Sequence, residues 1–333
     1  MRRGGVIAML CLSGCSGVQT MLGGEGAEGA NFINLFTVFL AVCTVMYLIV
    51  AAALLVALWR RRSAALTLDD RKHHQISRTV GPALAVWTAL IGTGLVGLTI
   101  VSFFTDRSNA ANGSTPQLNL TVTANQFWWD VEYNSADASR TVRTANEIHL
   151  PVGVPAEVTL KSNDVIHSFW IPNLAGKQDL IPGRVTDAQL LPRKVGVFRG
   201  QCAEFCGVQH TKMALDVTVE SKANFDRWYA AQLRSAPAPA NPLQRAGYTY
   251  FTTRECAACH NISGTPATGQ VAPDLTHFAS RRSIAAGTLP MNTRNIANWV
   301  ANPQDKKLGN RMPTVPLNPN DLRALTAYLE TLK

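Results

Sequence analysis

Two uncharged apolar runs near the start of the chain constrain its fold most strongly. Residues 35–59 and residues 80–104 are each 25 residues long and contain no charged side chain. Each run exceeds the roughly 20 residues that an α-helix needs to cross the hydrocarbon core of a bilayer. In lipid, a single segment satisfies its backbone hydrogen bonds only as a helix. The sequence therefore predicts two transmembrane helices rather than a buried hairpin in a soluble protein.

The segment between these runs, residues 60–79, predicts their orientation. It carries six Arg and Lys side chains against two Asp. An excess of basic residues in a short loop is typical of the cytoplasmic side of a membrane. We therefore expect both ends of the chain on the opposite side, which for a bacterial inner membrane is the periplasmic or outer side.

The first residues have the features of a bacterial export signal. Arg2 and Arg3 precede a short apolar run that ends in Leu-Ser-Gly-Cys at Cys15. This pattern resembles a lipoprotein signal, in which Cys15 becomes the lipidated first residue. We expect a signal peptide over residues 1–14 and an exported segment over residues 15–34; the alternative is an uncleaved N-terminus.

The formal charge of +9 raises nucleic acid as a partner, so its distribution matters. Basic residues are dispersed along the chain outside the predicted cytoplasmic loop, and residues 106–230 are nearly neutral, with 12 basic and 13 acidic side chains. A nucleic-acid-binding surface is typically a dense basic patch or stripe. We expect a membrane partner and no nucleic-acid partner.

After the second run, residues 116–225 change to short segments of alternating apolar and polar residues separated by turn residues. Residues 118–123, 156–160 and 215–219 show this alternation. A period of two over five or six residues indicates half-buried strands. The pattern predicts an antiparallel β-sandwich or barrel.

This domain carries a dense set of soft metal-binding side chains. Cys202 and Cys206 stand four residues apart, and His210 and Met213 follow in the same loop. His167 lies on a separate segment. Thiolate, imidazole and thioether together select soft or borderline metals, copper above all. Zinc rarely takes Met, and an iron–sulfur cluster needs more thiolates. Two thiolates can bridge two metal ions and leave one His for each.

The last part of the chain follows an amphipathic and proline-rich segment, residues 226–242. Asn241-Pro242 is typical of a helix start. Cys256-Ala-Ala-Cys259-His260 then matches the attachment signature of a c-type haem, with two thioethers and an axial His. A thioredoxin-like redox pair is the competing interpretation, but no βαβ pattern surrounds the motif.

The two runs and the Cys/His/Met loop together resemble subunit II of the haem–copper cytochrome c oxidases over residues 30–225. The resemblance implies a cupredoxin domain with a binuclear copper A centre of two copper ions. It also implies a magnesium ion at the Glu204 side chain, shared with subunit I. The implied copper ligands are the bridging Cys202 and Cys206, the terminal His167 and His210, and Met213 with the backbone carbonyl of Glu204.

Two departures from this family concern electron and proton transfer. Members carry an aromatic run whose first Trp accepts electrons from cytochrome c. The corresponding residues here are Phe127, Trp128 and Trp129, with Phe127 where that Trp is expected. The alternative role for these aromatic residues is in the sandwich core. Many members also carry a Glu before the second span, and residues 74–79 contain no acid.

Residues 243–333 resemble a small class I cytochrome c. This resemblance implies one covalently bound haem c on Cys256 and Cys259. It implies His260 as one axial ligand, held by the carbonyl of Pro273, and Met312, just before the last helix, as the other. Met291 and then His277 are the alternatives to Met312.

Together these features predict a multi-domain membrane protein with a two-helix transmembrane hairpin, a cupredoxin-like β-sandwich and an all-α cytochrome c domain. The resemblance implies the electron-input subunit of a proton-translocating, caa-type oxidase. Electrons from a cytochrome c-type donor would pass through haem c and copper A to haem a and copper B in subunit I, where oxygen is reduced to water. Subunit III is a further implied partner. The alternative is a stand-alone membrane-anchored electron carrier or copper-handling protein.

Overall fold

The computed structural model describes residues 17–62, 70–111 and 115–333. The predicted signal peptide, Cys15 and the middle of the predicted cytoplasmic loop lie outside these ranges. The described chain divides into two compact units. Residues 30–111 form one unit, and residues 17–29 with 115–333 form the other.

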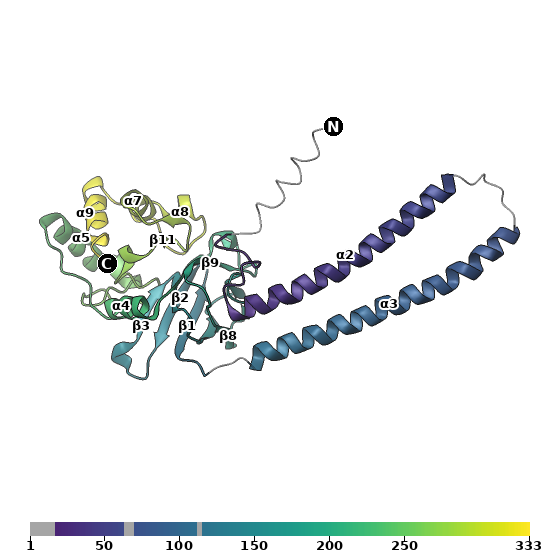
Figure 1. Ribbon diagram of the computed structural model, residues 1–333. Helices are drawn as coiled ribbons and strands as arrows, with labels where there is room; N and C mark the ends of the chain where they lie inside the picture. The colour runs from purple at the N-terminus through teal and green to yellow at the C-terminus, as the bar shows by residue number, and fades with distance from the viewer. Residues whose placement is uncertain (1–16, 63–69, 112–114) are drawn as a thin grey trace, which may run out of the picture. The chain divides into compact units, whose positions relative to one another are not determined.

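The first unit consists of two long helices, α2 (Ala27–Arg62) and α3 (Asp70–Ala111) (Figure 1). Both are long and apolar enough to cross a membrane, and most of their large apolar side chains are exposed. Such exposure is unfavourable in water and is expected where lipid covers the surface. The helices extend beyond the predicted spans at both ends.

The middle of the chain, the sandwich domain (residues 116–225), is a pair of five-stranded sheets. The cupredoxin-like β-sandwich is therefore confirmed. One sheet has the order β3-β2-β1-β5-β8 and the other β4-β10-β9-β6-β7. The strands are β1 (Leu118–Asn125), β2 (Trp128–Asn134), β3 (Val142–Ala145), β4 (Glu147–Pro151), β5 (Ala156–Ser162), β6 (His167–Trp170), β7 (Gln178–Leu180), β8 (Thr186–Leu190), β9 (Gly196–Cys202) and β10 (Ala214–Glu220).

The alternation predicted purely antiparallel sheets, and this part of the prediction is wrong. Strand β1 runs parallel to β5, and β4 runs parallel to β10, while the other pairs are antiparallel. Alternation reports which face of a sheet a residue occupies, and it contains no information on the direction of the neighbouring strand.

The core of this domain lies between the two sheets. Alternate residues of β1 (Leu120, Val122 and Ala124) are fully buried. Asn146 moves the chain from β3 in one sheet to β4 in the other, in the left-handed region at φ 61°. Asn tolerates this conformation, and its Oδ1 accepts a hydrogen bond from the Trp129 backbone N–H at 2.9 Å.

The C-terminal domain (residues 243–333) is helical, as predicted, with one short β-hairpin between its helices. The preceding helix, α4 (Lys222–Gln232), packs against β3 and β4 of the sandwich. The elements of the C-terminal domain are α5 (Pro242–Thr253), α6 (Cys256–Cys259), β11 (Ser283–Ile284), β12 (Leu289–Pro290), α7 (Thr293–Ala301), α8 (Pro303–Lys306) and α9 (Pro319–Leu329).

Helices α5 and α9 form the core of the C-terminal domain. The predicted start of α5 is confirmed, because the Asn241 side chain accepts a hydrogen bond from the Gln244 backbone N–H at 2.9 Å. Gly247 faces α9 so closely that a Cβ there would lie 2.0 Å from the carbonyl oxygen of Ala324. The two backbones therefore touch at a position that only glycine fits.

The sandwich and C-terminal domains share buried polar contacts within their unit. Arg281 Nε lies 3.6 Å from the Glu147 carboxylate, and both side chains are almost fully buried. Ser283 Oγ also donates a hydrogen bond to the Asp216 carboxylate. Because a buried charge is stable only when it is paired, these contacts favour one arrangement of the two domains.

Replacing Gly247 with Ala tests the packing of α5 on α9. At an exposed helix position the change stabilises a protein by up to about 1 kcal/mol. Here the methyl group would overlap the Ala324 carbonyl, so we expect a loss of roughly 1–3 kcal/mol. Thermal unfolding of the full-length protein should show a lower Tm. The exposed Arg245→Ala on the same helix is the control, and a raised Tm for Gly247→Ala would contradict the close contact.

Candidate metal and haem sites

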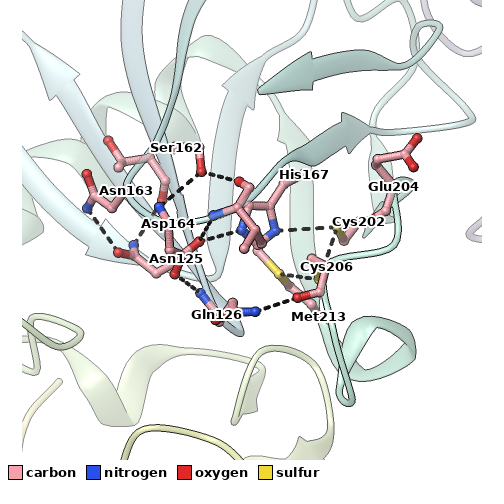
Figure 2. A network of polar contacts seen from close by, with 12 residues as sticks. Asn125, Gln126, Ser162, Asn163, Asp164, His167, Cys202, Glu204, Cys206 and Met213 are labelled. Atoms are coloured by element: carbon pink, nitrogen blue, oxygen red, sulfur yellow. Dashed lines mark hydrogen bonds and ion pairs between the residues drawn. The ribbon is translucent and has the colours of Figure 1, made fainter. Parts of the chain in front are cut away.

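The sandwich topology brings the predicted metal ligands to one end of one sheet (Figure 2). His167 begins β6, and Cys202 ends the neighbouring β9, where Phe169 pairs with Cys202. Residues 202–213 connect β9 to β10 and carry Cys206, His210 and Met213. Because these residues are predicted copper ligands, we call this segment the copper-ligand loop. Since β9 and β10 are antiparallel neighbours, the loop folds back over the end of β6.

The ligand atoms form a compact cluster. Cys202 Sγ lies 3.8 Å from Cys206 Sγ and 3.7 Å from His167 Nδ1. Cys206 Sγ lies 3.7 Å from His210 Nδ1 and 3.9 Å from Met213 Sδ. The structure thus brings together all five side chains that the sequence analysis selected.

These distances fit a shared metal centre. A disulfide would place the sulfur atoms about 2.05 Å apart, well below the observed separation. Two ligands of one metal ion, each bonded at roughly 2.0–2.3 Å, lie about as far apart as the observed atoms. Cys202, Cys206, Met213 and His167 are all buried, so water is largely excluded.

The two thiols also have opposite pKa shifts. The hydrogen bond from Cys206 lowers the pKa of the Cys202 thiol to about 3 against the effect of burial, and His167 adds to the lowering. The hydrogen bond to Cys202 and burial raise the pKa of Cys206 well above its usual range. The surrounding protein therefore stabilises one of the two cysteines as a thiolate. A nearby cation would favour ionisation of both.

Asp164 is a functional residue that the sequence analysis missed. Its Oδ1 lies 2.8 Å from His167 Nε2, and it accepts hydrogen bonds from the backbone N–H groups of Gln126 and Val165 at 2.7 and 2.8 Å. The bond to Asp164 leaves His167 Nδ1 free for the metal, an arrangement common to metal-bound histidines. Its position three residues before His167 is the only signal that the sequence offered.

Asp164 and His167 each stabilise the charged form of the other, and their pKa values shift in opposite directions. Burial lowers the pKa of His167, but Asp164 and Cys202 outweigh it and raise the net value. Burial raises the pKa of Asp164, and its bonds to His167 and to the two backbone N–H groups outweigh that effect and lower it. Asp164 is therefore ionised and fixed in place.

Glu204 contributes two different groups. Its backbone carbonyl oxygen lies 3.3 Å from Cys202 Sγ, at the cluster. Its side chain points away from the sulfur atoms (Figure 2), is partly exposed, and lies 3.7 Å from Lys177 Nζ. The carbonyl thus fits the predicted copper ligand, and the carboxylate is available to a cation outside the cluster.

Two of the three aromatic residues of the predicted electron-accepting run are buried in the sandwich core. Phe127 is 5% exposed and Trp129 is fully buried, whereas Trp128 is partly exposed. The Trp129 ring packs edge-on against the His167 ring, with centroids 6.2 Å apart. A soluble donor therefore has little access to Phe127 in this conformation.

The second site lies in the C-terminal domain. Cys256 and Cys259 lie on α6 as free thiols, and His260 follows directly. His260 Nδ1 lies 2.7 Å from the carbonyl oxygen of Pro273, which is the partner the sequence analysis expected. Burial lowers the pKa of His260, so the ring is neutral and Nε2 carries a lone pair. These groups fit a covalently attached haem.

The candidates for the second axial position are separated along the chain. Met312 is half-buried, and its backbone is held by Asn310 Oδ1 and Gln304 Nε2 at 2.8 and 2.9 Å. Met291 is also half-buried and packs against the hydrophobic cluster of the domain. His277 Nε2 lies 3.0 Å from the carbonyl oxygen of Arg234, so the linker already engages that nitrogen. Met312 stays a prediction.

Comparisons with known proteins match both domains. Residues 121–221 match the family described as cytochrome C oxidase subunit II, periplasmic domain, and residues 244–333 match the family described as cytochrome c.

Relatives extend this likeness to the whole chain. Cytochrome c oxidase subunit 2 of Alkalihalophilus pseudofirmus is 30% identical over 334 residues, covering 97% of this chain and 94% of the relative. The subunit 2 of Bacillus sp. (strain PS3) is 33% identical over 226 residues, covering 64% and 62%. The crystal structure of the periplasmic domain of subunit II of cytochrome oxidase (CoxB) of Bradyrhizobium japonicum is 27% identical. It covers 36% of this chain and 95% of that chain, with a TM-score of 0.33.

Replacing Asp164 with Ala tests whether it positions a metal ligand. Loss of a carboxylate partner of a metal-bound His typically weakens metal binding by about 10- to 100-fold. We expect that loss for copper, measured by competition with a chromophoric chelator. Asp187→Ala, an exposed carboxylate on β8, is the control and should keep full affinity. Equal affinities for the two variants would show that Asp164 does not position His167.

Proposed function

Because the chain belongs to the cytochrome c oxidase subunit 2 family, we propose that it is the electron-input subunit of a terminal respiratory oxidase. It accepts electrons in its C-terminal domain and delivers them through the copper-ligand loop to subunit I, which reduces oxygen to water. The observation that carries the proposal is one compact unit that contains both a buried Cys/His/Met cluster and a Cys-x-x-Cys-His motif.

The cluster has the donor set of a binuclear copper A centre. Cys202 and Cys206 would bridge two copper ions, with His167 and His210 as terminal ligands. Met213 and the Glu204 carbonyl would complete the ligand set. When bound, such a copper pair would supply one-electron transfer with little change in ligand geometry. The protein supports this by holding the ligands in a buried, hydrogen-bonded loop, with Asp164 fixing the His167 ring.

The C-terminal domain has the groups for one covalent haem c. Cys256 and Cys259 would form the thioethers, with His260 and Met312 as axial ligands and Met291 as the alternative to Met312. Pro273 orients the His260 ring through its carbonyl. Axial His/Met ligation raises a haem potential, which suits a group that receives electrons from a cytochrome c-type donor.

The burial of Phe127 supports electron input through the C-terminal domain. In the family pattern, the first aromatic residue of this run receives electrons directly. Here Lys307 of the C-terminal domain donates a hydrogen bond to the Phe127 carbonyl at 2.7 Å, and the Phe127 side chain is almost fully buried. We therefore place input at the haem and transfer to copper near Phe127–Trp129.

The proposed setting is a bacterial inner membrane. The hairpin α2–α3 would anchor the chain, with residues 60–79 on the cytoplasmic side and both redox domains on the periplasmic side, after export by a lipoprotein-type signal with lipidation at Cys15. The proposed partners are subunit I with haem a and copper B, subunit III, and a magnesium ion between Glu204 and subunit I. The assembled oxidase would be proton-translocating.

The alternative is a stand-alone membrane-anchored electron carrier or copper-handling protein. The second apolar helix favours the oxidase, because one span or one lipid already anchors a carrier. Copurification of a large subunit that contains haem a would separate the two functions.

Removal of residues 241–333 tests the proposed route. We expect reduction of the copper centre by the cytochrome c donor to be abolished or to fall by orders of magnitude, since a short tether supplies an effective concentration of about mM. Stopped-flow absorbance measures the rate, and reduction by dithionite is the control for an intact copper centre. Unchanged turnover in the truncated protein would contradict input through the haem.

Substitution of Met312 with Ala tests the sixth haem ligand. We expect the ferric haem to lose its sulfur-to-iron charge-transfer band and its potential to fall, because thioether ligation raises the potential. Absorption spectroscopy and redox titration measure both. Met291→Ala is the matched control and should retain the band. Loss of the band in Met291→Ala alone would assign the ligand to Met291.

A further inference from the structure

Lys307 joins the two redox domains through a buried cation. It follows α8 in the C-terminal domain and is 2% exposed. Its Nζ donates hydrogen bonds to the carbonyl oxygens of Phe127 and Lys212 at 2.7 Å each, and of Ala285 at 3.1 Å. Two of these acceptors belong to the sandwich domain and one to the C-terminal domain. Three acceptors match the three N–H groups of an ammonium.

One of the two sandwich carbonyls belongs to the copper-ligand loop, and the other follows a residue that is hydrogen-bonded to that loop. Lys212 directly precedes Met213, a proposed copper ligand. Phe127 directly follows Gln126, whose Nε2 donates a hydrogen bond to the Cys206 carbonyl at 2.6 Å. Lys307 is therefore bonded to the loop itself through Lys212, and through Phe127 to the segment that holds the Cys206 carbonyl.

Three further hydrogen bonds join the C-terminal domain to the sandwich around Lys307. Gln209 Nε2 donates to the Leu308 carbonyl at 2.7 Å, and Lys212 Nζ donates to the Lys306 carbonyl at 2.8 Å. Ala214 N–H, next to Met213, donates to the Ala286 carbonyl at 3.1 Å. Residues 209–214 thus donate directional hydrogen bonds to backbone carbonyls of the C-terminal domain, in addition to the bond that the Lys212 carbonyl accepts from Lys307.

The turn that presents Ala286 has an unusual backbone. Ala285, Ala286 and Gly287 all lie in the left-handed region, at φ 55°, 56° and 72°. Residues with a Cβ rarely adopt this conformation, and it persists where surrounding contacts determine it. The turn contacts Lys307 through Ala285 and the sandwich through Ala286, so the docked arrangement supplies those contacts.

A buried ammonium also favours one docked arrangement over displaced ones. Burial lowers the pKa of Lys307 to about 7, which reflects the loss of solvation on entering this site. Three carbonyl acceptors offset part of that loss in the observed geometry. A shift of the C-terminal domain by a few ångströms would leave both the amine and the carbonyls buried without partners, which is strongly unfavourable.

We propose that Lys307 is a positioning residue that locks the C-terminal domain onto the copper-ligand loop, so that electrons cross within a fixed complex instead of after a search by a tethered domain. This inference rests on the proposed function for the two redox groups. It adds a specific contact to the linker, which by itself supplies only proximity.

The test is Lys307→Met in the full-length, cofactor-loaded protein, with Lys306→Met as the matched control that removes the same charge one residue away. Flash-induced reduction of the haem, followed at the copper absorption, measures the transfer rate. We expect Lys307→Met to lower this rate by about tenfold or more, since it removes three charged hydrogen bonds. The rate should also become dependent on solvent viscosity, because the domain must now find its position. Lys306→Met should match the wild type.

A second measurement does not depend on the redox groups. Hydrogen exchange of the Ala214 amide, which donates to Ala286, should become faster in Lys307→Met and stay unchanged in Lys306→Met. If Lys307→Met does not accumulate, Lys307→Gln, which retains two N–H donors, should give intermediate values in both measurements.

The outcomes separate the two levels of the proposal. Wild-type transfer and exchange in Lys307→Met would overturn the positioning role and leave the proposed function intact. Failure of the proposed function would be seen in the wild type itself, as the absence of a copper electron paramagnetic resonance signal or of any transfer from haem to copper.

Discussion

Two buried thiols 3.8 Å apart cannot both ionise without a cation between them, and this constraint organises the sandwich domain. One thiolate is stabilised beside His167, while the second is strongly disfavoured. Positive charge beside the sulfur atoms would let both thiols ionise, and the proposed copper ions would supply it. The ends of β6, β9 and β10 bring the ligands together, and Asp164 sets the ring nitrogen that faces the sulfur atoms. Ligands fixed at the end of a sheet suit a metal centre that must gain and lose an electron with little change in ligand positions.

The contacts between the two redox domains follow a similar principle. Buried cations of the C-terminal domain, Lys307 and Arg281, meet carbonyl oxygens or a carboxylate of the sandwich. Such pairs add little net stability, because desolvation offsets attraction. They do penalise displaced arrangements, which leave a charge unpaired. The interface is thus better suited to specifying one geometry than to binding tightly, and the covalent linker makes tight binding unnecessary.

Much of this architecture was predictable from local sequence signals. The two apolar runs predicted α2 and α3, and Asn241 predicted the start of α5, because each pattern is contained within a short stretch of chain. The spacing of Cys202 to Met213 predicted a metal cluster for the same reason. The parallel pairs of the sandwich, Asp164 and Lys307 were missed. The strand pairing and Lys307 depend on residues far away in sequence, such as Phe127, 180 positions before Lys307, and no local pattern encodes such partners. Asp164 is close to His167 in sequence, but an Asp three residues before a His does not by itself distinguish a partner of a metal ligand from any other loop carboxylate.

The buried position of Phe127 has a consequence for how such an oxidase adapts to its host. With that side chain covered, the proposed entry of electrons at the haem would make donor recognition a property of the outer surface of residues 243–333. Mutations there would then retune donor selectivity without disturbing the metal cluster or the surface proposed to meet the catalytic subunit. On the proposed function, fusion of the two domains in one chain would separate donor specificity from energy conversion, so that each could evolve independently.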